Sequence, residues 1–85
     1  MKKIKKEPVL FNKLGEKIKK IRKDKGYTNQ EKFAYESNIP RAQYGRYEKG
    51  SNMTILSLYA ILKHHKISFK KFFAEGFDDL DKLMK

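Results

Sequence analysis

The stretch NIPRAQYGRYEKG, residues 38–50, predicts a short helix with one aromatic face and one basic face. Tyr44 and Tyr47 are three residues apart, so they share one helical face. Their large rings favour burial, with each hydroxyl near the edge of the core. Arg41 and Arg46 fall on a different face, where charge favours exposure. The pattern therefore predicts a helix whose tyrosines face inward and whose arginines face outward.

The outward face of this helix, expected over about 41–49, is basic and rich in hydrogen-bonding groups. It consists of Arg41, Ala42, Gln43, Gly45 and Arg46. The major groove of duplex DNA admits one α-helix, and Arg and Gln can form bidentate hydrogen bonds to guanine and adenine there. The residue types and their placement therefore both favour a helix that enters a major groove.

Two further helices are expected before this one. Apolar residues at helical spacing predict a helix over 11–25, with Gly26 as its stop. Thr28 and Glu31 have the spacing of a capping box, which predicts that a second helix begins there. Asn38 tolerates left-handed geometry and predicts a tight turn into the next helix. Two helices joined in this way form a helix-turn-helix unit.

The second half of the chain predicts two more helices, capped by Thr54 and Ser68. Apolar residues at helical spacing mark the fourth, and a phenylalanine cluster marks the fifth, which Gly76 ends. The residues at helical spacing in the fourth helix are Ile55, Leu58, Ile61 and Leu62, and the residues expected in the core from the fifth are Phe69, Phe72 and Phe73. Some of these phenylalanines could instead form a dimer seam with Phe77, Leu80 and Leu83. No segment alternates as a strand does, so the fold class predicted is all-α, a compact five-helix bundle.

The chain of 85 residues is expected to form one domain with two short extensions. Residues 1–10 are expected to be a basic flexible arm, because Pro8 disfavours a helix before it. Residues 11–76 are expected to form the helix-turn-helix domain. Residues 77–85 would form a short C-terminal tail with room for one more turn of helix.

Charge is the strongest signal in the composition. The chain has 21 Lys and Arg against 10 Asp and Glu, a formal net charge of +11. Such an excess favours a polyanionic partner, with nucleic acid ahead of an anionic membrane surface. No apolar run is long enough for a signal peptide or a membrane span, and there is no cysteine. We therefore expect a cytoplasmic protein that does not bind a membrane.

Enzymatic and metal chemistry are not expected. His64 and His65 are adjacent, so on a helix their side chains point about 100° apart and do not readily share one ion. The sequence contains neither a glycine-rich phosphate loop nor a nucleophile with an adjacent base. We expect no metal, no cofactor and no catalytic activity.

Three segments resemble the Cro/repressor-type (Xre-like) helix-turn-helix family. They are LGEKIKKIRKDKG (14–26), QEKFAYESNIPRAQYGRYEKG (30–50) and TILSLYAILKHHKISFKKFF (54–73). The resemblance implies five helices, of which the second and third bind double-stranded DNA. It further implies a sequence-specific transcriptional regulator, a repressor, that acts as a homodimer on a two-fold operator.

The resemblance also implies roles for individual residues. The base-contacting positions are Arg41, Ala42, Gln43 and Arg46. The positions expected to contact phosphates are Asn29, Gln30, Lys49, Ser51 and Asn52. Arg22 and Glu48 match a pair of residues that forms an ion pair between the first helix and the end of the third.

Two alternatives remain open at the level of the sequence. The chain could be the antitoxin of a toxin–antitoxin pair, which would also bind a protein partner through its C-terminal tail. It could instead be a protein-interaction domain that keeps the fold without reading DNA. Co-purification of a partner would favour the antitoxin, and failure to bind any duplex would favour the interaction domain.

Overall fold

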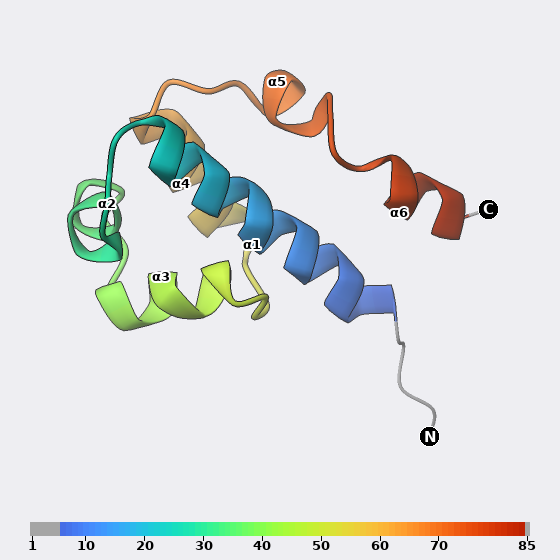
Figure 1. Cartoon of the computed structure of the whole chain (residues 1–85), viewed down its shortest axis with the longest axis horizontal. Coiled ribbons are helices and arrows are strands. Elements are labelled where there is room, and N and C mark those ends of the chain that lie inside the picture. Colours follow the sequence, from blue (N-terminus) through green and yellow to red (C-terminus); the bar gives the residue numbers. More distant parts are fainter. Residues whose placement is uncertain (1–5, 85) are drawn as a thin grey trace.

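Six α-helices and the short loops between them make up residues 6–84, the part of the chain that the computed structural model describes (Figure 1). They are α1 (Lys6–Asp24), α2 (Gln30–Glu36), α3 (Arg41–Glu48), α4 (Ile55–His64), α5 (Phe69–Phe73) and α6 (Asp78–Leu83). No strand occurs within residues 6–84, and the all-α prediction is confirmed. The number of helices exceeds the expected five because the C-terminal tail forms α6.

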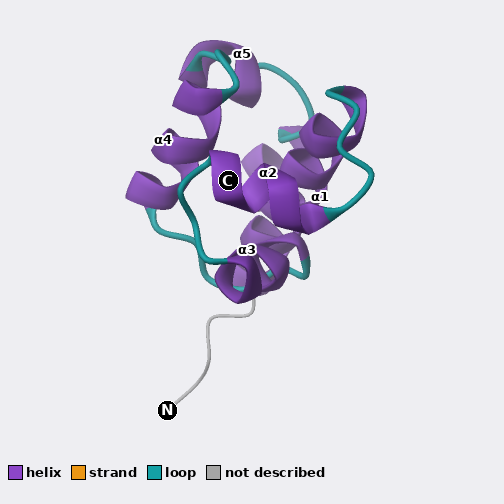
Figure 2. Ribbon diagram, turned by 90° about the vertical axis from the view of Figure 1, so that its left-hand side faces the viewer, coloured by secondary structure: helices purple, strands orange, loops and turns teal. Residues whose placement is uncertain are grey.

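The long helix α1 lies through the middle of the molecule, with α3 on one side and α5 on the opposite side (Figures 1 and 2). The core between the helices is aliphatic and aromatic. Its members include Leu14, Ile18, Phe33, Ala34, Tyr44, Tyr47, Leu58, Ile61, Leu62 and Phe72. Because these residues come from five different helices, each short helix is held in place mainly by packing.

Helix α1 begins earlier than predicted, at Lys6, so residues 6–10 do not form an arm. Pro8 lies in the first turn of this helix, where backbone N–H groups have no acceptor within the helix in any case. Its missing N–H therefore costs no hydrogen bond, and the helix starts before the proline. The remainder of the predicted arm, residues 1–5, lies outside the described residues.

Side-chain caps mark the starts of α2, α4 and α5. Thr54 and Ser68 cap α4 and α5 as predicted. The capping box predicted at Thr28 is wrong, because Asn29 is the cap of α2 and its Oδ1 accepts from the backbone N–H of Lys32 at 3.3 Å. Asparagine is as effective a cap as threonine, and starting from Asn29 shifts the helix by one residue.

The first four helices all end at a residue with left-handed backbone geometry. These residues are Gly26, Asn38, Gly50 and Lys66, with φ values of 90°, 63°, 97° and 60°. Gly26 and Asn38 were predicted as a stop and a turn, because glycine and asparagine adopt this geometry at low cost. Lys66 was not predicted, because a lysine in a sequence gives no such signal.

The C-terminal part differs from the prediction in two ways. Of the phenylalanines expected in the core, only Phe72 is buried, whereas Phe69 and Phe73 are exposed. Phe77 is buried as well, and its ring centroid lies 5.0 Å from that of Phe73. Phe77 therefore belongs to the core, and Leu80 packs against it, so the start of the expected tail contacts the domain.

Candidate nucleic-acid interface

Helix α3 is fixed on the core by its two tyrosines. Tyr44 is 0% exposed and Tyr47 is 4% exposed, as their spacing predicted. The Tyr44 ring lies 5.3 Å from that of Phe33 on α2, which couples the two helices of the helix-turn-helix unit. Gly15 of α1 lies against the other end of α3, where a Cβ atom would be 2.4 Å from the carbonyl oxygen of Tyr47. The close approach of these two backbones requires a glycine.

The opposite face of α3 is open to solvent. Arg41, Ala42 and Arg46 are exposed, and Gln43 and Gly45 are partly exposed. Neither arginine forms an ion pair with another side chain among those that the structure describes, residues 9–82 and 84. Their guanidinium groups are therefore available to a polyanion, and they lie on the face that the core does not use.

The loop after α3 continues this exposed face. Gly50 N–H bonds to the Tyr47 carbonyl at 3.1 Å, and Ser51 N–H bonds to the Arg46 carbonyl at 3.0 Å. These two bonds close the helix in a Schellman motif. Lys49 and Asn52 are exposed beside it, and Ser51 is partly exposed. The three loop residues predicted to contact phosphates therefore lie at the C-terminal end of α3.

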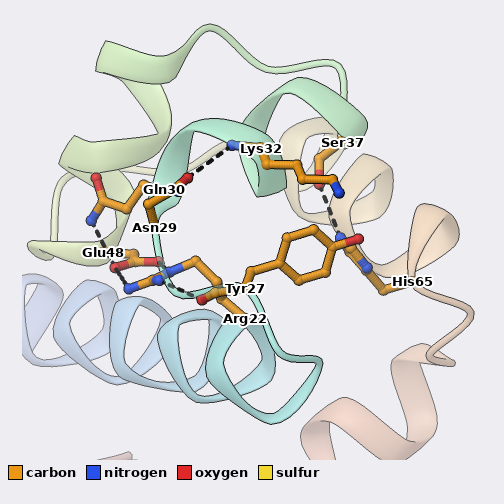
Figure 3. A network of polar contacts seen from close by, with 8 residues as sticks. All are labelled: Arg22, Tyr27, Asn29, Gln30, Lys32, Ser37, Glu48 and His65. Atoms are coloured by element: carbon orange, nitrogen blue, oxygen red, sulfur yellow. Dashed lines mark hydrogen bonds and ion pairs between the residues drawn. The ribbon is translucent and has the colours of Figure 1, made fainter.

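The two polar residues at the start of α2 have different surroundings. Asn29 is exposed, and its capping bond uses only the side-chain oxygen, so its NH₂ group remains available. Gln30 is turned toward α3, where its Nε2 donates to Oε1 of Glu48 at 2.9 Å (Figure 3). One of the two amide protons of Gln30 is therefore occupied within the protein.

Glu48 lies at the centre of a polar network that joins three helices (Figure 3). Arg22 of α1 donates from Nε to Oε2 of Glu48 at 2.7 Å and from Nη2 to Oε1 at 3.3 Å. Its Nη1 also donates to the Tyr27 carbonyl at 2.8 Å, in the link between α1 and α2. The side chains of Arg22 and Glu48 are only 5% and 3% exposed. The network therefore fixes the end of α3 relative to α1 and α2.

The charges of this pair are mutually stabilised. Burial acts to raise the pKa of Glu48, but the hydrogen bonds that it accepts, with that of Arg22 the largest, lower the pKa below its usual value. The hydrogen bond to Glu48 likewise raises the pKa of Arg22. The carboxylate is thus ionised and neutralised inside the protein. Because Arg22 balances the charge of Glu48, this carboxylate should repel a phosphate near α3 only weakly.

The adjacent histidines occupy separate environments. The His65 ring is buried, stacks on Phe33 at 4.1 Å and has its Nε2 3.3 Å from the Ser37 hydroxyl (Figure 3). Burial lowers the pKa of His65 to about 4. His64 is exposed, with its Nε2 3.7 Å from a carboxylate oxygen of Glu36. Within the described residues, no cluster of three or more metal-ligating side chains is present.

One contact on α3 was not anticipated from the sequence. The Nε2 of Gln43 donates a hydrogen bond to the Tyr47 hydroxyl, which in turn lies 2.9 Å from the Ser57 hydroxyl of α4. Gln43 and Tyr47 are four residues apart, the spacing at which side chains meet on a helix. The spacing could therefore have indicated the contact of Gln43 with Tyr47. It gives no indication of the contact of Tyr47 with Ser57.

A helix-turn-helix family model matches residues 18–72 of the chain, which include α2, α3 and α4. The chain belongs to this family of DNA-binding regulators, the Cro/repressor-type (Xre-like) group that its sequence resembles. No curated protein and no solved structure matches the chain significantly. Of the helices that the structure describes, none combines the length and the apolar character needed to cross a membrane.

Proposed function

We propose that this protein is a sequence-specific regulator of transcription, a repressor, that reads the major groove of double-stranded DNA with α3. The observation that carries the proposal is the division of α3 into two faces. Its tyrosines are buried, and its arginines are exposed without ion pairs to the side chains that the structure describes. The base-reading residues are Arg41, Ala42, Gln43 and Arg46, of which the small Ala42 permits close approach.

The proposed phosphate contacts lie near the C-terminal end of this helix, where Gln30 of α2 donates to Glu48. Lys49, Ser51 and Asn52 lie at the C-terminal end of α3. Asn29 and the remaining amide proton of Gln30 lie at the start of α2. The net charge of +11 supplies the long-range attraction. Affinity should therefore fall steeply as the salt concentration rises, because each neutralised phosphate releases counterions.

We further propose that two copies bind together, through an exposed apolar surface on α4 and α5. This surface consists of Ile55, Leu56, Tyr59, Phe69 and Phe73, all exposed. The Tyr59 and Phe69 rings stack at 6.2 Å, and the Phe69 and Phe73 rings stack at 6.4 Å. Exposed apolar patches of this kind favour association. The α5 part of this surface lies on the side of α1 opposite α3 (Figure 2). Leu56 and Tyr59 of α4, by contrast, line a pocket that Gln43 of α3 also lines.

Selection from a random duplex pool with the full chain at physiological salt tests the proposal. We expect a defined sequence to be enriched, with two half-sites whose centres are about 34 Å apart if two copies bind side by side. Enrichment of no sequence at any salt concentration would overturn the proposed function. An enriched site without two-fold symmetry would overturn the dimer alone.

The regulatory direction needs a separate measurement. The enriched site is placed within a promoter that drives a reporter, and the protein is supplied in trans. Occupancy of the site should exclude polymerase and lower expression. A rise in expression would contradict repression and leave DNA reading intact.

A further inference from the structure

A chain of hydrogen bonds runs from the exposed face of α3 into the start of α4. Gln43 Nε2 donates to the Tyr47 hydroxyl, and that hydroxyl lies 2.9 Å from Ser57 Oγ. Thr54 donates from Oγ1 to Ser57 Oγ at 3.1 Å, and its own Oγ1 accepts from the Ser57 backbone N–H at 3.1 Å. The chain therefore connects a residue of the reading face to the N-terminal cap of α4.

The Tyr47 hydroxyl is held in place by its buried ring and by its hydrogen bonds to Gln43 and Ser57. The tyrosine ring is buried, so it cannot swing to a new position without disturbing the core. Because the Tyr47 oxygen accepts from Gln43, its own proton is available for Ser57. A consistent direction follows, in which Gln43 donates to Tyr47 and Tyr47 donates to Ser57.

This arrangement leaves Gln43 with a defined set of free groups. A glutamine amide has two N–H donors and one carbonyl acceptor. With one N–H held by Tyr47, a single N–H and the carbonyl oxygen remain. In the major groove adenine presents one acceptor and one donor, N7 and the N6 amino group. Guanine presents two acceptors, N7 and O6, which would need both N–H groups.

We propose that Tyr47 is a positioning residue that commits the Gln43 amide to adenine and disfavours guanine at the base that Gln43 reads. The inference rests on the proposed function, because it requires that α3 lie in a major groove. Ser57 supports Tyr47 from α4. Discrimination thus comes from a buried hydroxyl as well as from the exposed amide.

The experiment compares the full chain and its variants on the selected operator and on duplexes changed at one base pair at a time. Gln43→Ala first identifies the base position that Gln43 reads. Tyr47→Phe removes only the hydroxyl and should lower the preference for adenine over guanine at that position about fivefold or more, the lower end of a bidentate contact. Preferences at the positions read by Arg41 and Arg46 should persist.

Tyr44→Phe is the matched control. It makes the same change on the same helix, and the Tyr44 hydroxyl is buried without a hydrogen-bond partner among the described residues. This variant should keep the adenine preference. Ser57→Ala is the second test, since it leaves the tyrosine in place and removes its support; it should weaken the same preference to a smaller extent.

Three outcomes would overturn the inference. Tyr47→Phe could retain full discrimination at the position where Gln43→Ala loses it, or the base at that position could be other than adenine. Tyr47→Phe could also weaken binding to all duplexes equally, which would indicate a structural role only. If the wild-type chain selects no sequence, the proposed function fails first, and this result is distinct from the other three.

A measurement without DNA separates the two proposals further. In the free protein, ¹⁵N relaxation of the Gln43 side-chain amide should indicate a rigid group, which becomes mobile in Tyr47→Phe and stays rigid in Tyr44→Phe. A mobile Gln43 amide in the wild-type protein would contradict the inference while leaving DNA binding untouched.

Discussion

The buried guanidinium of Arg22 binds both carboxylate oxygens of Glu48, a residue 26 positions further along the chain. Glu48 is the last residue of α3, and Arg22 lies in the last turn of α1. The pair therefore fixes the end of the candidate reading helix on the longest helix of the domain. Arg22 also donates to the Tyr27 carbonyl in the α1–α2 link, and Gln30 of α2 donates to Glu48.

We expect Glu48→Ala to destabilise the fold strongly. The change leaves the Arg22 charge buried without its partner, which costs about 3–5 kcal/mol. In a domain of this size such a loss lowers Tm by more than about 10 °C. Glu16→Ala is the control, because Glu16 is exposed on α1 and forms no ion pair with a residue in 6–84. Equal melting temperatures for the two variants would show that the Arg22–Glu48 pair does not stabilise the fold.

We expect Arg46→Ala to abolish much of the preference for the operator while the helical fold persists. Arg46 is exposed and has no ion pair in the described chain, so its loss should cost little stability. Loss of a bidentate base contact costs about 1–3 kcal/mol of discrimination. Competition between specific and scrambled duplexes measures the preference for the operator. Lys82→Ala on α6 is the control for the loss of one positive charge. An Arg46→Ala protein that binds the same bases with unchanged affinity would place α3 outside the groove.

The stability of the protein should fall as the pH is lowered from about 6.5 to about 4. Burial, followed by the charges of His64 and Lys25, lowers the pKa of His65 from 6.5 to about 4. Within that interval the unfolded chain binds a proton that the folded chain excludes, so acid favours unfolding. Protonation of His65 can lower the free energy of unfolding by about 3 kcal/mol at most.

Thermal melts across this pH range test the role of His65. His65→Phe keeps an aromatic ring against Phe33 and removes the titrating group, so its Tm should depend less on pH. His64→Gln, which alters the exposed neighbour, should keep most of the wild-type dependence. A His65→Phe protein as sensitive to pH as the wild type would assign the effect to other groups.

Two glycine-to-alanine changes should differ in their effect on stability. At Gly15 the new Cβ would lie 2.4 Å from the Tyr47 carbonyl oxygen, and a backbone atom cannot yield. Helix α1 would have to move away from α3, at a cost of about 1–3 kcal/mol. At Gly45 the nearest atom is the end of the Gln30 side chain at 3.1 Å, which can move. Chemical denaturation should therefore show Gly15→Ala weakened and Gly45→Ala unchanged or stabilised by up to about 1 kcal/mol.

Much of the fold could be predicted because its signals are local. The cap residues Thr54 and Ser68, the turn at Asn38 and the spacing of Tyr44 and Tyr47 each act within a few residues. The start of α1 and the capping residue of α2 were mispredicted, since Pro8 is tolerated within a first helical turn as well as before a helix, and Thr28 and Asn29 are both good caps. Such choices depend on small differences in free energy between alternatives that a sequence does not resolve.

The candidate site was less accessible to sequence reasoning, because its contacts cross between helices. The exposed face of α3 followed from periodicity alone. The contact of Gln30 with Glu48, and that of Tyr47 with Ser57, join residues 18 and 10 positions apart and depend on how the helices pack. Only the folded chain shows that an amide expected at a phosphate is partly used inside the protein.

Helix α3 has only eight residues, fewer than the roughly 12–15 that persist as a helix alone in water. A synthetic peptide of residues 38–50 would therefore carry every side chain proposed to face the bases, but without the helical spacing between them. Discrimination among operators should vanish in the same cooperative transition in which tertiary structure melts. A mild destabilisation far from α3 would thus lower occupancy of the operator by depleting the competent population, with the intrinsic affinity of the folded molecules unchanged.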